Sequence, residues 1–207
     1  MISIDKKSIA TLPLAHFDGR IHVLDNATDA LKAVAYLSKQ RVLGFDTETR
    51  PSFHKGDNHR VALIQLSTDS ECFLFRINRT GFTEPLIKLM ENEEVMKVGL
   101  STKDDLHGLN LIATFNPGGI IELQQLVKQY EIVDMSLQRI YAILFNQHIS
   151  KGQRLTNWEA PTLTHHQQAY AALDAWACLR IYKYLSAGLF DPASSPYIID
   201  DNLTNNK

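Results

Sequence analysis

The stretch VLGFDTET, residues 42–49, begins as an apolar strand and ends with two carboxylates, Asp46 and Glu48. Residues two apart on a strand face the same side, so the two acids project together while Leu43 and Phe45 face the other way. Like charges on one face oppose burial unless a cation compensates them. We expect an arginine, a lysine or a divalent metal ion beside this strand, unless both acids meet water at its end.

Strand-like and helix-like segments alternate around this stretch. Strand patterns occupy residues 20–25, 41–48, 60–68, 71–77 and 94–101. Helical patterns occupy residues 26–40, 83–92, 102–111, 120–130, 136–146 and 163–188. The short TDS link between the third and fourth strands permits a hairpin, which requires antiparallel pairing. The sequence therefore predicts an α/β fold with a mixed central β-sheet flanked by α-helices.

Length, charge and cysteine content limit the class of protein. The 207 residues are 44% hydrophobic, which suits one core, and we expect a domain over residues 20–190, an N-terminal extension over 1–19 and a polar C-terminal tail over 191–207. The net charge of −2 neither indicates nor excludes nucleic-acid binding, which depends on local patches. Cys72 and Cys178 lack disulfide or zinc spacing and are predicted to be buried thiols. With no secretory signal and no apolar run of ~20 residues, the prediction is a soluble, cytoplasmic protein without a membrane partner.

Two further segments carry acidic residues that could join Asp46 and Glu48 in one site. Tyr170 and Asp174 lie four residues apart on the predicted last helix and so share a face, either as part of a site or as an ordinary polar stripe. Asp104 and Asp105 fall near a helix start, where aspartate also serves as a cap. Oxygen ligands without histidine or cysteine suit Mg²⁺ or Mn²⁺. Several converging carboxylates are what a two-metal phosphoryl-transfer site requires.

These segments, with their flanks, resemble one known family. The matching stretches are GFDTETRP, RVALIQLST, KVGLSTKDDLHGL and RLTNWEAPTLTHHQQAYAALDAWACLRIY. They are similar to the DEDDy branch of the DEDD 3′–5′ exonucleases, in particular to ribonuclease D and the exonuclease domain of the Werner syndrome protein. The similarity covers about residues 20–187 and implies a ribonuclease-H-like fold. It also implies hydrolysis of nucleic-acid phosphodiester bonds from the 3′ end, with release of nucleoside 5′-monophosphates.

The resemblance also implies roles for particular residues. Two ions, Mg²⁺ or Mn²⁺, would be held by four carboxylates: Asp46, Glu48, Asp105 and Asp174. Asp105 is preferred to Asp104 because the family's acid directly precedes the first apolar residue of the helix, here Leu106, but Asp104 stays open. Tyr170 would hydrogen-bond and orient the attacking water.

Substrate contacts are expected around these acids. The predicted contacts are Thr47, Phe53, Lys103 and Arg154. Phe53 either stacks on a terminal base or folds back onto the core. Where this chain reads EAPTL, ribonuclease D relatives often have an arginine-proline pair before the final helix, and Arg154 is expected to take part of its role. Trp158 is expected to pack beneath the last helix. Two other interpretations stay open. The chain could be a catalytically silent nucleic-acid-binding module of the same fold, or an α/β interaction domain whose acids are incidental. The choice between DNA and RNA as substrate also stays open.

Overall fold

The computed structural model describes residues 1–54 and 56–199 and contains a six-stranded sheet in the order β1-β4-β3-β2-β5-β6. The strands are β1 (Arg20–Leu24), β2 (Val42–Thr49), β3 (Val61–Ser67), β4 (Glu71–Phe75), β5 (Met96–Gly99) and β6 (Ile120–Glu122). Strand β3 is antiparallel to β2 and β4, whereas the other neighbouring pairs are parallel. The predicted hairpin and the mixed sheet are both confirmed.

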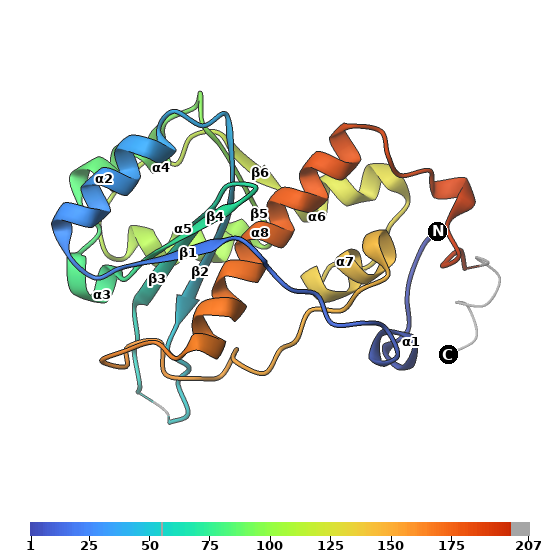
Figure 1. Cartoon of the computed structure of the whole chain (residues 1–207), viewed down its shortest axis with the longest axis horizontal. Coiled ribbons are helices and arrows are strands. Elements are labelled where there is room, and N and C mark those ends of the chain that lie inside the picture. The colour runs from blue at the N-terminus through green and yellow to red at the C-terminus, as the bar shows by residue number, and fades with distance from the viewer. Residues whose placement is uncertain (55, 200–207) are drawn as a thin grey trace.

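Helices cover both faces of the sheet. They are α1 (Lys6–Ala10), α2 (Ala27–Leu37), α3 (Ile77–Thr80), α4 (Glu84–Glu91), α5 (Thr102–Asn110), α6 (Leu123–Leu126), α7 (Leu137–Phe145) and α8 (His165–Ser186), with 3₁₀ turns at Val127–Tyr130 and Pro192–Ser194. Figure 1 shows α8 running across the sheet, with α6 and α7 on the side away from α2 and α4. No helix within the described ranges is long and apolar enough to cross a membrane.

Strand β2 separates two apolar layers. Leu43 and Phe45 are fully buried against residues of α2, α4 and α5. Gly44 faces the opposite layer, where α8 packs over β2 and β3. The alternation predicted from the sequence is therefore confirmed, and the Asp46–Glu48 face looks toward α8.

Helix α8 runs from His165 to Ser186, within the predicted range 163–188. The Thr164 hydroxyl accepts a hydrogen bond from the Gln167 backbone N–H, and the Gln167 side chain accepts one from the Thr164 N–H, which forms a capping box. Gly188, just after the helix, has a φ of 68°, a left-handed conformation that favours glycine. Trp158 is fully buried beneath this helix in a cluster with Ala171 and Ala172, as expected.

The segment 120–130 is a correction to the predicted helix. Ile120 and Ile121 begin it as β6, which pairs with β5, and the β-branched side chains favour the strand. The helical pattern is real only from Leu123 onward, where the Glu122 side chain caps α6 by accepting from the Gln124 N–H.

The segments outside the central domain pack against it. Ile2, Ile4 and Ile9 are buried in a cluster with apolar residues of α7 and α8. Ile2 also forms backbone bridges with Ile132 and Ile198, so residues 1–3 and residues 197–199 of the predicted C-terminal tail lie side by side. The rest of that predicted tail, residues 200–207, lies outside the described residues.

Candidate active site

The close approach of α8 to β2 creates the site. A Cβ atom at Gly44 would lie 1.9 Å from the Ala175 carbonyl oxygen, so glycine is needed for the helix to sit this close to the strand. Asp174 precedes Ala175 on α8, and Asp46 follows Gly44 by two residues on the same face of β2. The glycine thereby brings the strand and helix acids together.

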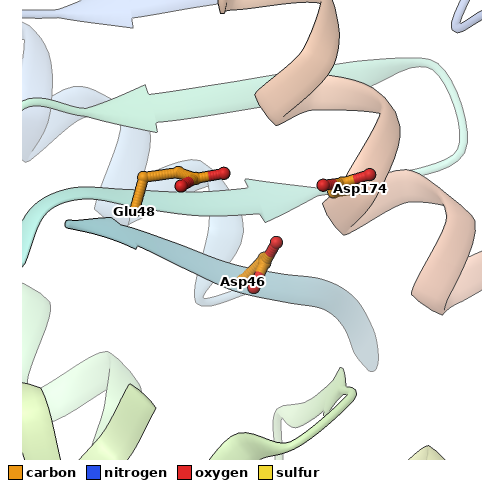
Figure 2. A group of neighbouring side chains, drawn as sticks. All are labelled: Asp46, Glu48 and Asp174. Carbon is orange, nitrogen blue, oxygen red and sulfur yellow. The ribbon is translucent and has the colours of Figure 1, made fainter. Parts of the chain in front are cut away.

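Three carboxylates converge at this contact. Asp46, Glu48 and Asp174 each offer an oxygen, and these oxygens all lie within 4.8 Å of one another. Figure 2 shows Asp46 and Glu48 on the strand and Asp174 on the neighbouring helix, with the three carboxylates pointing into the same region between them. Strand and helix acids that lie far apart in the sequence thus form one cluster.

Asp105 borders this cluster from α5. The Thr47 hydroxyl donates a hydrogen bond to Asp105 Oδ1 at 2.5 Å. Asp105 is half-buried and its charge acts on both Asp46 and Glu48, whereas Asp104 is exposed. Of the two adjacent aspartates, Asp105 is thus the one whose charge reaches the cluster, although it is not among the three acids whose oxygens lie within 4.8 Å of one another.

A carboxylate that the sequence analysis did not single out, Glu122, fixes the start of α5. It accepts hydrogen bonds from the backbone N–H groups of Ser101 and Thr102 at 3.0 and 2.7 Å. Ser101 has a φ of 61°, a left-handed conformation that is uncommon without glycine. Glu122 therefore holds a strained turn that directs α5, and with it Asp105, toward the cluster.

Burial and mutual repulsion raise the pKa values of these acids. Burial raises the pKa of Asp46 well above its usual range, and the neighbouring Asp105, Asp174 and Glu48 raise it further. Burial and the Asp174 and Asp105 charges raise the pKa of Glu48 to about 9. Burial also raises the pKa of Asp174 to about 7 and that of Asp105 to about 6. Without a cation, the cluster holds protons at neutral pH.

The donor set fits a divalent cation. Asp174 Oδ1 is buried and accepts no hydrogen bond from the described part of the chain. Within residues 1–54 and 56–199, no lysine or arginine lies within 4.0 Å of the oxygens of Asp46, Glu48, Asp105 or Asp174. The arginine or lysine that the sequence left possible is therefore not paired with these acids here. An all-oxygen cluster suits hard cations such as Mg²⁺ or Mn²⁺.

Tyr170 lies at the edge of the cluster, one helical turn before Asp174. Burial raises its pKa, and the Asp174, Glu48 and Asp46 carboxylates raise it further. Its ring packs against Trp158, with centroids 6.1 Å apart. The hydroxyl is therefore a neutral hydrogen-bond donor at neutral pH, held in place from below by Trp158.

A pocket of about 330 Å³ opens beside the acids. Its wall includes Ser101, Lys151, Arg154, Tyr170 and Asp174. Lys151 and Arg154 are exposed, and their charges lower the pKa values of Asp174 and Glu48 respectively. The pocket thus joins the carboxylates to two cations that can meet an anionic substrate.

The predicted substrate contacts fall in different places. Arg154 lines the pocket, but the Thr47 hydroxyl is engaged with Asp105. Lys103 is exposed, and Phe53 is 69% exposed, so the alternative that Phe53 folds back onto the core is wrong. Lys151, which was not among the predicted contacts, also lines the pocket, and its place there depends on how the loop before α8 folds.

Fold and site together define a class, α/β domains that can hold a divalent cation with carboxylates between a sheet and a helix. The family model described as 3′–5′ exonuclease matches residues 21–189. This chain belongs to that family, as its resemblance predicted.

Relatives and solved structures agree with this assignment. Mouse WRN, described as a bifunctional 3′–5′ exonuclease and ATP-dependent helicase, is 31% identical over 190 residues, which cover 84% of this chain but 13% of WRN. The exonuclease domain of Nibbler from Aedes aegypti has a TM-score of 0.75 at 23% identity, covering 87% of this chain and 95% of that one. Ribonuclease D from Escherichia coli has a TM-score of 0.73 at 19% identity, covering 81% and 44%. Both structures share the fold, which confirms the predicted ribonuclease-H-like architecture.

Gly44→Ala is expected to lower the melting temperature and weaken Mg²⁺ binding together. The added methyl group would force α8 away from β2, and overpacking of this kind costs about 1–3 kcal/mol. Thermal unfolding with and without Mg²⁺ measures both effects. Gly152→Ala is the matched control, because its Cβ would meet only the Ser150 hydroxyl at 3.4 Å. A Gly44→Ala protein with wild-type stability and Mg²⁺ response would contradict the role of this contact.

Proposed function

We propose that this chain is a metal-dependent 3′–5′ exonuclease that hydrolyses the terminal phosphodiester bond of a nucleic acid and releases a nucleoside 5′-monophosphate. The observation that carries the proposal is the convergence of Asp46, Glu48 and Asp174 in a family of 3′–5′ exonucleases. Asp105 completes the set from α5. A purely structural domain would gain nothing from burying mutually repelling acids.

The proposed cofactor is a pair of Mg²⁺ or Mn²⁺ ions held by these four carboxylates. Bound divalent ions would supply charge stabilisation at the scissile phosphate and lower the pKa of the attacking water. The carboxylates would be ionised in that state, because metal binding requires the deprotonated ligands. The acidic surface would then no longer repel the phosphate.

Tyr170 is proposed to orient the attacking water, as in the DEDDy branch. Its raised pKa makes the hydroxyl a donor, so it positions the water instead of removing the proton. Lys151 and Arg154, on the pocket wall, would bind phosphate oxygens of the terminal nucleotides. Phe53 and Lys103, both exposed, remain proposed contacts with the strand beyond the pocket.

The substrate is proposed to be the 3′ end of DNA or RNA. A related ribonuclease D, from Trypanosoma brucei, has been crystallised as a complex with the RNA U12, whereas WRN is described as a helicase as well as an exonuclease. The buried free cysteines Cys72 and Cys178 suit a reducing compartment, and the cytoplasmic location stays a prediction.

A labelled-substrate assay tests the proposal. Purified protein with Mg²⁺ or Mn²⁺ is expected to shorten 5′-labelled single-stranded DNA, recessed duplex DNA or RNA from the 3′ end, and EDTA and Asp46→Ala are expected to abolish the ladder. Tyr170→Phe is expected to lower the rate by about 100-fold, the lower end of what a positioned acid–base side chain contributes. The rise in melting temperature that Mg²⁺ causes is expected to stay the same in this variant. Folded protein that binds these nucleic acids but cleaves none of them would instead support the catalytically silent binding module.

A further inference from the structure

Gln65, on the central strand β3, carries a buried side-chain amide. Its side chain is 0% exposed, and neither Nε2 nor Oε1 has a hydrogen-bond partner among the residues that the structure describes. A buried polar group left unpaired destabilises the fold, because it has lost its hydrogen bonds to water without replacing them. Such a group in the middle of a central strand therefore calls for a role that offsets this cost.

The position of Gln65 points to the carboxylate site. In the antiparallel pairing of β2 and β3, Gln65 lies directly opposite Asp46, which places their Cβ atoms about 4.5–5.5 Å apart on the same face. Leu63, two residues earlier on β3, packs in the cluster that contains Ala171 of α8. Gln65 shares that face with Leu63, so its side chain lies beside Asp46 on the side of the sheet that α8 covers.

The chemistry of the amide complements that of its surroundings. The groups whose charges act on Asp46 are all carboxylates, from Asp105, Asp174 and Glu48. Ionised carboxylates only accept hydrogen bonds, whereas the Gln65 Nε2 group has two protons to donate. Gln65 therefore brings a neutral donor to a place where four acids must be ionised together.

We propose that Gln65 is a positioning residue of the metal site, whose Nε2 donates to the Asp46 carboxylate when that carboxylate is ionised and holds the cation. The hydrogen bond fixes the orientation of the Asp46 oxygens and leaves one of them for the ion. This inference rests on the proposed function, because it concerns the ionised, metal-binding state of the same site. Partners of this kind typically change metal affinity by about 10–100-fold.

Gln65→Met tests this role with Mg²⁺ alone, measured by titration calorimetry and by thermal unfolding in EDTA. The methionine keeps the volume but removes the amide, so the Mg²⁺ dissociation constant is expected to rise by about 10–100-fold. In EDTA the melting temperature is expected to stay the same or rise, because an unpaired buried amide is lost. Leu63→Met on the same face of β3 is the matched control, expected to bind Mg²⁺ as wild type does. Gln65→Leu provides a second apolar variant if the methionine packs poorly.

The outcomes separate this inference from the proposed function. Wild-type protein that does not bind Mg²⁺ would overturn the metal site itself. Wild type that binds Mg²⁺ while Gln65→Met and Gln65→Leu bind it equally well would overturn only the role of Gln65. A large loss of stability in EDTA for both Gln65 variants, but not for Leu63→Met, would also overturn it, because the amide would then serve the fold.

Discussion

Asp105→Asn is expected to lower the rate of 3′-end hydrolysis by more than about 100-fold. The variant removes a proposed ligand, and loss of a residue that only supports a ligand already costs up to about 100-fold. Asp104→Asn is expected to retain nearly the full rate. Asp105 is half-buried, accepts the Thr47 hydroxyl and acts on Asp46 and Glu48, whereas Asp104 is exposed. The two variants make the same chemical change at adjacent positions, so each is a control for the other.

The comparison needs two measurements, the rate with saturating Mg²⁺ and the Mg²⁺-induced change in melting temperature. Both are expected to fall in Asp105→Asn alone, because the residue is assigned to metal binding. A larger loss of both quantities in Asp104→Asn would instead make Asp104 the metal ligand from α5. Equal, small effects in both variants would mean that α5 contributes no ligand.

Much of the site followed from local periodicity. The two-residue repeat of a strand predicted that Asp46 and Glu48 share a face, and the four-residue spacing on a helix predicted the same for Tyr170 and Asp174. The structure confirms that the strand and helix acids converge. The sequence could name these acids because a local rule determines where each one points.

Other features depend on long-range pairing and could not be predicted in this way. Gln65 is one polar residue in an apolar strand, and only the β2–β3 register places it opposite Asp46. Glu122 lay within a predicted helix, yet it ends β6 and its carboxylate reaches the start of α5, 20 residues earlier. The close fit of Gly44 against Ala175 likewise depends on how α8 crosses the sheet.

The metal-free protein is expected to lose stability as the pH rises from about 4 to about 9. In EDTA the folded-state pKa of Glu48 is about 9, that of Asp174 about 7 and that of Asp105 about 6, each above its ordinary value near 4. The folded state therefore holds more protons than the unfolded state across this range, and the free energy of unfolding falls as pH increases. The contribution is fully present below about pH 4 and is lost as the pH passes the folded-state values.

Glu48→Gln tests the pKa shift of Glu48, which is larger than those of Asp174 and Asp105. At pH 7 the folded wild type keeps Glu48 protonated while the unfolded chain releases the proton, a difference of about 3 kcal/mol. The neutral glutamine removes that cost, so its melting temperature in EDTA at pH 7 is expected to exceed that of wild type by up to about 10 °C. A melting temperature in EDTA that is flat with pH in wild type, or equal in the two proteins at pH 7, would contradict the shift.

Mg²⁺ is expected to reverse the trend in wild type and to have little effect on Glu48→Gln. Because the ligands must lose their protons, binding releases protons and tightens as the pH rises, so the rise in melting temperature caused by Mg²⁺ should grow between about pH 6 and pH 9. Calorimetry in buffers of different ionisation enthalpy counts the protons released. The same repulsion that destabilises the metal-free fold thus gives the site its affinity for cations. Glu48→Gln is therefore expected to bind Mg²⁺ more weakly and to be more stable without it.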